Sequence, residues 1–166
     1  MSENQDELLE LEYDYESESS VVLDPVIAFK LGEQLYALPI EVVKEVIKCP
    51  EVTPMPELPP HLVGLVNVRG DVYAVTDLAM RFGLMGEEHQ MNFLVILDLE
   101  GYSLALGVNH VPDTIQIDLS QVQAPDNVNT SDGSFEYVQG FFQKDGELIT
   151  LLSVEKLVEQ DDFSLK

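Results

Sequence analysis

Arg69, Gly70 and Asp71 separate two apolar runs, and this turn carries the most distinctive side chain of the sequence. Arg69 is the only basic residue between Lys48 and Arg81 in a chain of formal net charge −23. A guanidinium presents five hydrogen-bond donors in a planar fork, which suits carboxylates and backbone carbonyls. The chemistry that the turn predicts is recognition of a protein partner, since no side-chain cluster suited to catalysis accompanies it.

The usual catalytic patterns are missing from the sequence. His61, His89 and His110 have no nucleophile or acid at motif spacing, and no GxSxG, P-loop, HExxH or CxxC pattern occurs. Cys49 is the only cysteine, so no internal disulfide can form and a reducing compartment is favoured. These features predict a binding protein that is not an enzyme, with no cofactor and no metal site.

The charge balance excludes several classes of partner. Eight Lys and Arg residues face 31 Asp and Glu residues, so neither nucleic acid nor an anionic membrane surface is an expected ligand. No apolar run approaches the roughly 20 residues of a membrane span, and no secretory signal opens the chain. We therefore expect a cytoplasmic protein without membrane insertion.

The first 24 residues differ from the rest of the chain. They hold nine acidic residues and no basic one, which is typical of a disordered acidic tail. The alternation of apolar and polar residues that marks a folded domain begins near Pro25. We expect a tail over residues 1–24 and a single folded unit over residues 25–160.

Short apolar runs separated by turn residues predict an all-β fold with little helix. The predicted strands cover residues 26–31, 35–40, 64–68, 72–76, 92–99, 102–111, 114–117, 137–143 and 147–152. Five prolines exclude a regular helix or a central strand from residues 49–60. Asp77 and Ser153 are each placed to cap a short helix that follows a strand pair. This repetition suggests two similar barrels, each finished by a helix.

Three segments, taken together and in order, resemble the CheW family of chemotaxis coupling proteins. They are FKLGEQLYALPIEVVKEVI (29–47), GLVNVRGDVYAVTDLAMRFG (64–83) and VQGFFQKDGELITLLSVEKLV (138–158). The resemblance covers nearly all of residues 26–158. It implies two five-stranded SH3-like β-barrels with short helices. It also implies an adaptor without activity of its own, which links the cytoplasmic tip of a methyl-accepting chemoreceptor to the regulatory domain of a CheA-type histidine kinase.

The same resemblance implies a set of partner-binding residues. In the family, the kinase contact is barrel-to-barrel packing of exposed strand and loop residues, and the receptor contact uses the groove between the barrels. Matched by motif, the candidates are Val43, Glu45, Val46, Gly64, Asn67, Arg69, Gly70 and Val95. Residue type also permits structural roles: the glycines could shape turns, Asn67 could bond the backbone, and Val46 and Val95 could belong to the core.

Three residues depart from the family pattern. Ala74 stands where proline is usual, Ala105 where glycine is usual and Asn109 where aspartate is usual. An adaptor for a type IV pilus system is therefore an alternative to flagellar chemotaxis. From another class, the density of carboxylates leaves open an acidic metal-binding or ligand-binding barrel, and a hydrolytic enzyme is a distant third.

Overall fold

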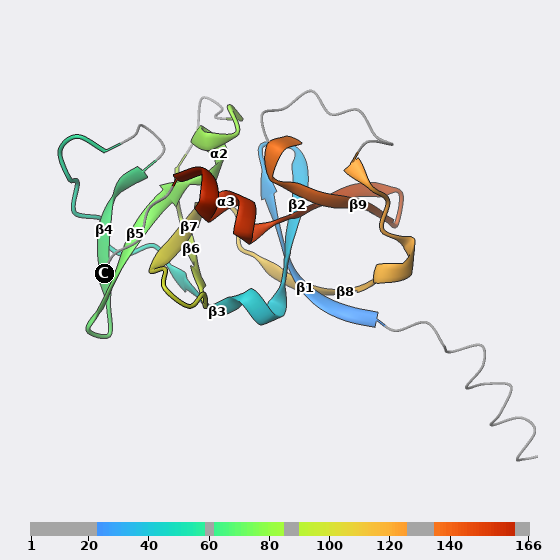
Figure 1. Cartoon of the computed structure of the whole chain (residues 1–166), viewed down its shortest axis with the longest axis horizontal. Coiled ribbons are helices and arrows are strands. Elements are labelled where there is room, and N and C mark those ends of the chain that lie inside the picture. The colour runs from blue at the N-terminus through green and yellow to red at the C-terminus, as the bar shows by residue number, and fades with distance from the viewer. Residues whose placement is uncertain (1–22, 59–61, 85–89, 126–134, 162–166) are drawn as a thin grey trace, which may run out of the picture.

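Ten strands of the computed structural model pair into two five-stranded sheets, as Figure 1 shows. The structure describes residues 23–58, 62–84, 90–125 and 135–161. All but the last two residues of the tail predicted over residues 1–24 lie outside these ranges, as do His61 and His89. The prediction of an all-β fold built from two small barrels with short helices is confirmed.

The first barrel has the strand order β3–β6–β7–β5–β4. Its strands are β3 (Val43–Lys48), β4 (Leu62–Val68), β5 (Asp71–Asp77), β6 (Phe93–Leu97) and β7 (Leu104–Val108). Neighbours are antiparallel except β5 and β7, which run parallel. The proline-rich residues 49–58 contribute a single bridge, in which Thr53 and Leu65 exchange backbone hydrogen bonds of 2.8 and 2.9 Å.

The second barrel has the order β8–β1–β2–β10–β9. Its strands are β1 (Leu23–Leu31), β2 (Gln34–Pro39), β8 (Asp113–Asp118), β9 (Val138–Lys144) and β10 (Glu147–Leu152). The parallel pair is β10 with β2, and the added bridge joins Gln123 to Phe141. The chain therefore starts in the second barrel, builds the first barrel, and then returns to complete the second.

Short helices occupy the connections. Within the described residues, the α-helices are α2 (Leu78–Arg81) and α3 (Val154–Asp161), and the 3-10 turns are η1 (Ile40–Val42), η2 (Leu119–Gln121) and η4 (Phe135–Tyr137). The Asp77 carboxylate accepts a hydrogen bond of 3.2 Å from the amide of Met80, and the Ser153 hydroxyl accepts one of 3.3 Å from the amide of Lys156. Both predicted N-caps are confirmed.

The predicted internal repetition is also confirmed, down to single positions. Gly64, Gly70 and Asp77 of the first barrel follow one another at the same spacing as Gly140, Gly146 and Ser153 of the second. In each barrel a hairpin is followed by a capped helix, and the second hairpin strand pairs in parallel with a strand of another hairpin. The two barrels are thus two copies of one backbone plan.

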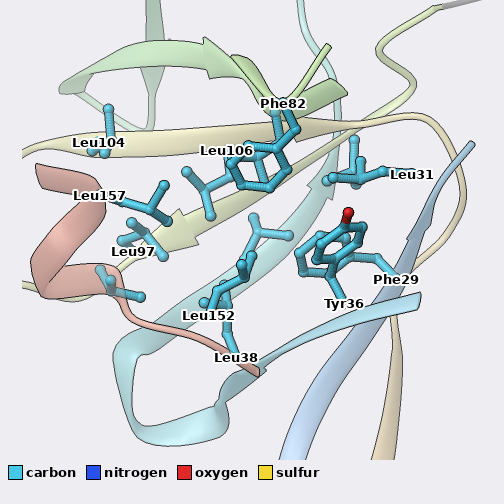
Figure 2. Close-up of a cluster of buried hydrophobic side chains, with 14 of the residues drawn as sticks. Phe29, Leu31, Tyr36, Leu38, Phe82, Leu97, Leu104, Leu106, Leu152 and Leu157 are labelled. Atoms are coloured by element: carbon cyan, nitrogen blue, oxygen red, sulfur yellow. The ribbon is translucent and has the colours of Figure 1, made fainter. Parts of the chain in front are cut away.

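Buried apolar side chains form three clusters. One lies inside each barrel, around Val75 and Ile96 in the first and around Ala37 and Ile117 in the second. The third and largest cluster joins the barrels, and Figure 2 shows side chains of both barrels and of α3 converging on it. Because burying a large apolar side chain stabilises a fold by roughly 1.5–3 kcal/mol, this shared cluster ties the two barrels into one structural unit.

Candidate partner-binding site

Arg69 lies at the tip of the β4–β5 hairpin. Val68 pairs with Asp71, so only Arg69 and Gly70 form the loop, and their φ angles are 52° and 91°. Two successive positive φ angles are typical of the type I′ turn that matches the twist of a hairpin. The Asn67 side-chain oxygen accepts a hydrogen bond of 3.0 Å from the amide of Gly70, which further fixes the turn. The backbone thus fixes the turn from which the Arg69 side chain extends.

Glu45 on β3, the strand at the opposite edge of the five-stranded sheet from β4, meets this guanidinium. Arg69 Nη1 lies 2.6 Å from both carboxylate oxygens of Glu45. The Arg69 side chain is 73% exposed and that of Glu45 24%. The hydrogen bond and the charge of Glu45 raise the pKa of Arg69 above its ordinary value. A solvent-exposed ion pair adds little to stability, so its main effect here is to orient the arginine fork.

Four of the eight predicted residues come together at this corner. The turn itself is formed by Arg69 and Gly70. The Asn67 side chain bonds to it, and Glu45 binds its guanidinium. Val43 is half-buried on the same strand as Glu45 and packs on the shared core. It pairs with Leu97 of that core, whereas Glu45 pairs with Ile96 inside the first barrel, so Val43 lies on the other face of the sheet. The corner therefore presents an oriented cation and an amide, which can bind polar groups of a protein element.

The structure assigns Val95 to the core. Its side chain is 0% exposed, and it pairs with Val46, which is itself partly buried against the shared core. A fully buried side chain makes no direct contact with a partner, so we remove Val95 from the candidate surface. Strand β6 is apolar on both faces, and for such a run the sequence pattern does not separate buried from exposed positions.

Gly64 is also explained by packing. Its φ angle is 150°, and a Cβ at this position would lie 2.2 Å from the carbonyl oxygen of Thr53. The second barrel repeats this close approach, because a Cβ at Gly140 would lie 2.8 Å from the carbonyl oxygen of Gln123. A glycine at this place lets an irregular segment bridge to the strand in both barrels. We therefore assign Gly64 a structural role in the barrel and remove it from the candidate surface.

The first barrel has a polar pocket of about 270 Å³ next to this hairpin. Lys44 donates a hydrogen bond of 3.3 Å to the hydroxyl of Tyr73. This bond, together with the charges of Asp71 and Asp98, raises the pKa of Lys44. Val72, which is 44% exposed, lines the pocket together with Leu97 and Leu99.

The second barrel has a larger and more apolar pocket of about 360 Å³. Leu35, Ile115 and Ile149 line it, and Val111, which is 65% exposed, stands at its edge. Charged groups of both signs, among them Lys30 and Glu147, complete the lining. The sequence analysis missed this surface, because the strand predicted over residues 102–111 took in Val111, whereas the structure ends β7 at Val108.

The one histidine that the structure describes lies at this pocket. His110 is exposed and contributes to the lining of the apolar pocket.

Among the described residues, no three His, Cys, Asp or Glu side chains gather closely enough to hold a metal ion. No helix in the described ranges is long and apolar enough to cross a membrane.

Cys49 lies against the interior of the first barrel. It is partly buried beside the cluster around Val75, and burial raises the pKa of its thiol. The thiol donates a weak hydrogen bond of 3.4 Å to the carbonyl of Pro50. A raised pKa disfavours the reactive thiolate, so these surroundings fit a packing role.

Comparison with known proteins gives one consistent match. The model of the CheW-like domain matches residues 25–162. The chain is 31% identical over 144 residues to the chemotaxis protein CheW of Treponema pallidum (strain Nichols), covering 83% of this chain and 84% of the relative. It is 31% identical over 137 residues to the protein FrzA of Myxococcus xanthus, covering 79% and 82%.

A solved structure agrees with these matches. The crystal structure of the scaffolding protein TtCheW from Thermoanaerobacter tengcongensis superposes with a TM-score of 0.76 at 29% sequence identity. The superposition covers 87% of this chain and 98% of that protein. The likeness therefore extends over both barrels and is not confined to one of them.

Proposed function

This chain belongs to the CheW-like family of chemotaxis adaptors, and we propose that it joins the cytoplasmic tip of a chemoreceptor to the regulatory domain of a CheA-type histidine kinase. It does so in the cytoplasm and without a reaction of its own. The observation that carries the proposal is the match of residues 25–162 to the family, together with two chemically different exposed surfaces, one on each barrel.

The Arg69 corner, at a hairpin tip of the first barrel and not in the groove between the barrels that the family resemblance implies, is the proposed receptor surface. It comprises Arg69, Glu45, Asn67 and Gly70. The receptor tip in this family is a helical hairpin, whose polar side chains and terminal carbonyls are acceptors for an oriented guanidinium. The ion pair with Glu45 supports this role, because it holds the guanidinium in place before the partner arrives and so lowers the cost of ordering it.

The apolar pocket of the second barrel is the proposed kinase surface. A specific interface needs an apolar centre with a polar rim, and the pocket has aliphatic walls with charged residues around them. Packing of one barrel against another would place an apolar side chain of the kinase domain in this pocket. The two partners would then occupy different barrels and bind at the same time.

Co-purification with the cognate kinase regulatory domain tests the proposal. We expect a complex with a Kd in the tens of micromolar or tighter, which corresponds to roughly −6 to −7 kcal/mol. The matched control is the Lys156→Glu variant, which reverses an exposed charge on α3 that belongs to neither proposed surface. Absence of binding at such concentrations, with a correctly folded chain, would contradict the proposed function.

The form of motility that the pathway controls is a second question. The likeness to FrzA is consistent with the alternative of a type IV pilus system. We propose chemotaxis coupling as the general role in either case. Deleting the gene and scoring both swimming and surface motility separates the outputs, since a pilus adaptor would affect only movement on surfaces.

A further inference from the structure

Arg81, the last residue of α2 in the first barrel, reaches across to the second barrel. Its Nη2 donates a hydrogen bond of 2.8 Å to the carbonyl of Leu157 in α3. Its guanidinium carbon also lies 4.6 Å from the centre of the Tyr137 ring, in the turn η4 that precedes β9. One side chain of the first barrel therefore contacts two separate segments that belong to the second.

A row of aromatic rings surrounds this contact. Phe82, next to Arg81, stacks on Tyr137 with ring centres 5.6 Å apart and meets Tyr36 at 5.5 Å. Tyr36 stacks in turn on Phe29 at 6.4 Å. Figure 2 shows Phe82 facing Tyr36 and Phe29 within the cluster that joins the barrels. The rings connect β1, β2, α2 and η4 in one continuous layer.

Arginine suits this position for a specific physical reason. The hydrophobic effect is non-directional, so the shared cluster constrains the angle between the barrels only through the fit of its side chains. A planar guanidinium that donates to a carbonyl and also lies over an aromatic face meets two directional requirements at once. A lysine ammonium is a compact charge without a planar fork and reproduces only part of this geometry.

We propose that Arg81 is a positioning residue that fixes the angle between the two barrels, so that the receptor surface on one and the kinase surface on the other are presented together. The proposal rests on the proposed function for its second half only. Its first half, the fixed angle, concerns the isolated chain and stands or falls without any partner.

Distance measurement between two spin labels tests the fixed angle. The labels are placed at Lys48→Cys on β3 and Gln143→Cys on β9, both exposed, in a Cys49→Ala background. We expect one narrow distance distribution for the parent chain and a clearly broader or shifted one for Arg81→Met, which keeps the chain length but removes the donors. The Lys156→Met control, on the surface of α3, should leave the distribution unchanged.

A second variant and a binding measurement keep the proposal open to refutation. If Arg81→Met does not fold, Arg81→Lys keeps the charge and should still broaden the distribution. With both partners present, the Arg81 variant should keep each separate affinity within about twofold, while the yield of the three-component complex falls about tenfold. An unchanged distance distribution would overturn the fixed angle, and a broadened one with an undiminished three-component complex would overturn its functional role.

Discussion

The hairpin turn of the first barrel carries Arg69 and Gly70, whereas the matching turn of the second carries Asp145 and Gly146. The φ angles agree, at 52° and 91° in one and 53° and 80° in the other. In the first barrel the turn cation binds a carboxylate on β3, but in the second Lys144, just before the turn, donates to the carbonyl of Gln116 on β8. The fold thus determines the turn and leaves its charge free to serve a function.

The pockets of the two barrels differ in the same way. Tyr73 and Ile149 occupy matching positions, three residues after the turn glycine. Tyr73 brings a hydroxyl that Lys44 binds, and its pocket is polar, while Ile149 borders a larger pocket with aliphatic walls. One duplicated plan therefore supplies two surfaces that suit two different partners.

Truncating one side chain of the shared core tests whether the two barrels unfold as one unit. Phe82→Ala removes a buried ring that contacts the rings of Tyr36 and Tyr137. We expect a loss of about 3–5 kcal/mol in the free energy of unfolding. Chemical denaturation followed by probes in each barrel should show a single transition. Two separate transitions, with only one of them shifted, would contradict a common core.

The two bridging glycines should differ in their tolerance. Gly64→Ala combines a positive φ with a backbone clash, and we expect it to cost about 2–4 kcal/mol. Gly140→Ala meets the Val122 side chain and the Gln123 carbonyl without a strained φ, and about 1–3 kcal/mol is expected. Thermal melts of both variants make the comparison, and a larger loss for Gly140→Ala would go against our explanation of Gly64.

Matched exposed valines test the difference between the pockets. Val111→Glu places a charge at the edge of the apolar pocket and should weaken kinase binding about tenfold, or about 1.4 kcal/mol. Val72→Glu makes the same change beside the polar pocket and should leave kinase binding within about twofold. Titration calorimetry of both variants decides, and equal losses would remove the distinction between the two barrels as kinase surfaces.

Cys49 offers a smaller effect that reports on the first barrel alone. Burial raises the pKa of its thiol, so less thiolate is present at neutral pH than for a free cysteine, and the thiolate fraction grows only at more alkaline pH. Alkylation by iodoacetamide at pH 8 should therefore be measurably slower than that of free cysteine and should accelerate as the pH rises. A rate equal to that of the free amino acid would mean that this side of the first barrel is open.

Local signals in the sequence were enough for much of the fold. The Arg69–Gly70 turn and the two helix caps follow from residue type, and both are observed. The parallel pairs, β5 with β7 and β10 with β2, join strands that are distant in the chain, and no local pattern encodes them. The pair of barrels was therefore expected from the short strands and the repeated hairpin and cap, whereas the number of strands in each barrel came from the family resemblance.

Only part of the candidate site could be predicted from such local signals in the sequence. Arg69 was distinctive because a lone cation on a glycine turn is visible in the sequence, and Glu45 came from the resemblance. Val95 was misplaced because an all-apolar strand hides which face is buried. The apolar pocket draws on β1, β2, β8 and β10, and such a surface exists only after long-range pairing.

The most direct test of the account is the Arg69→Glu variant with both partners measured separately. Because Arg69 is exposed and its ion pair adds little stability, the melting temperature should match that of the parent chain. We predict that receptor coupling falls at least about tenfold while the affinity for the kinase regulatory domain stays within about twofold. Unfolding of the variant, or an equal loss of both partners, would contradict the assignment of the two functions to two separate barrel surfaces.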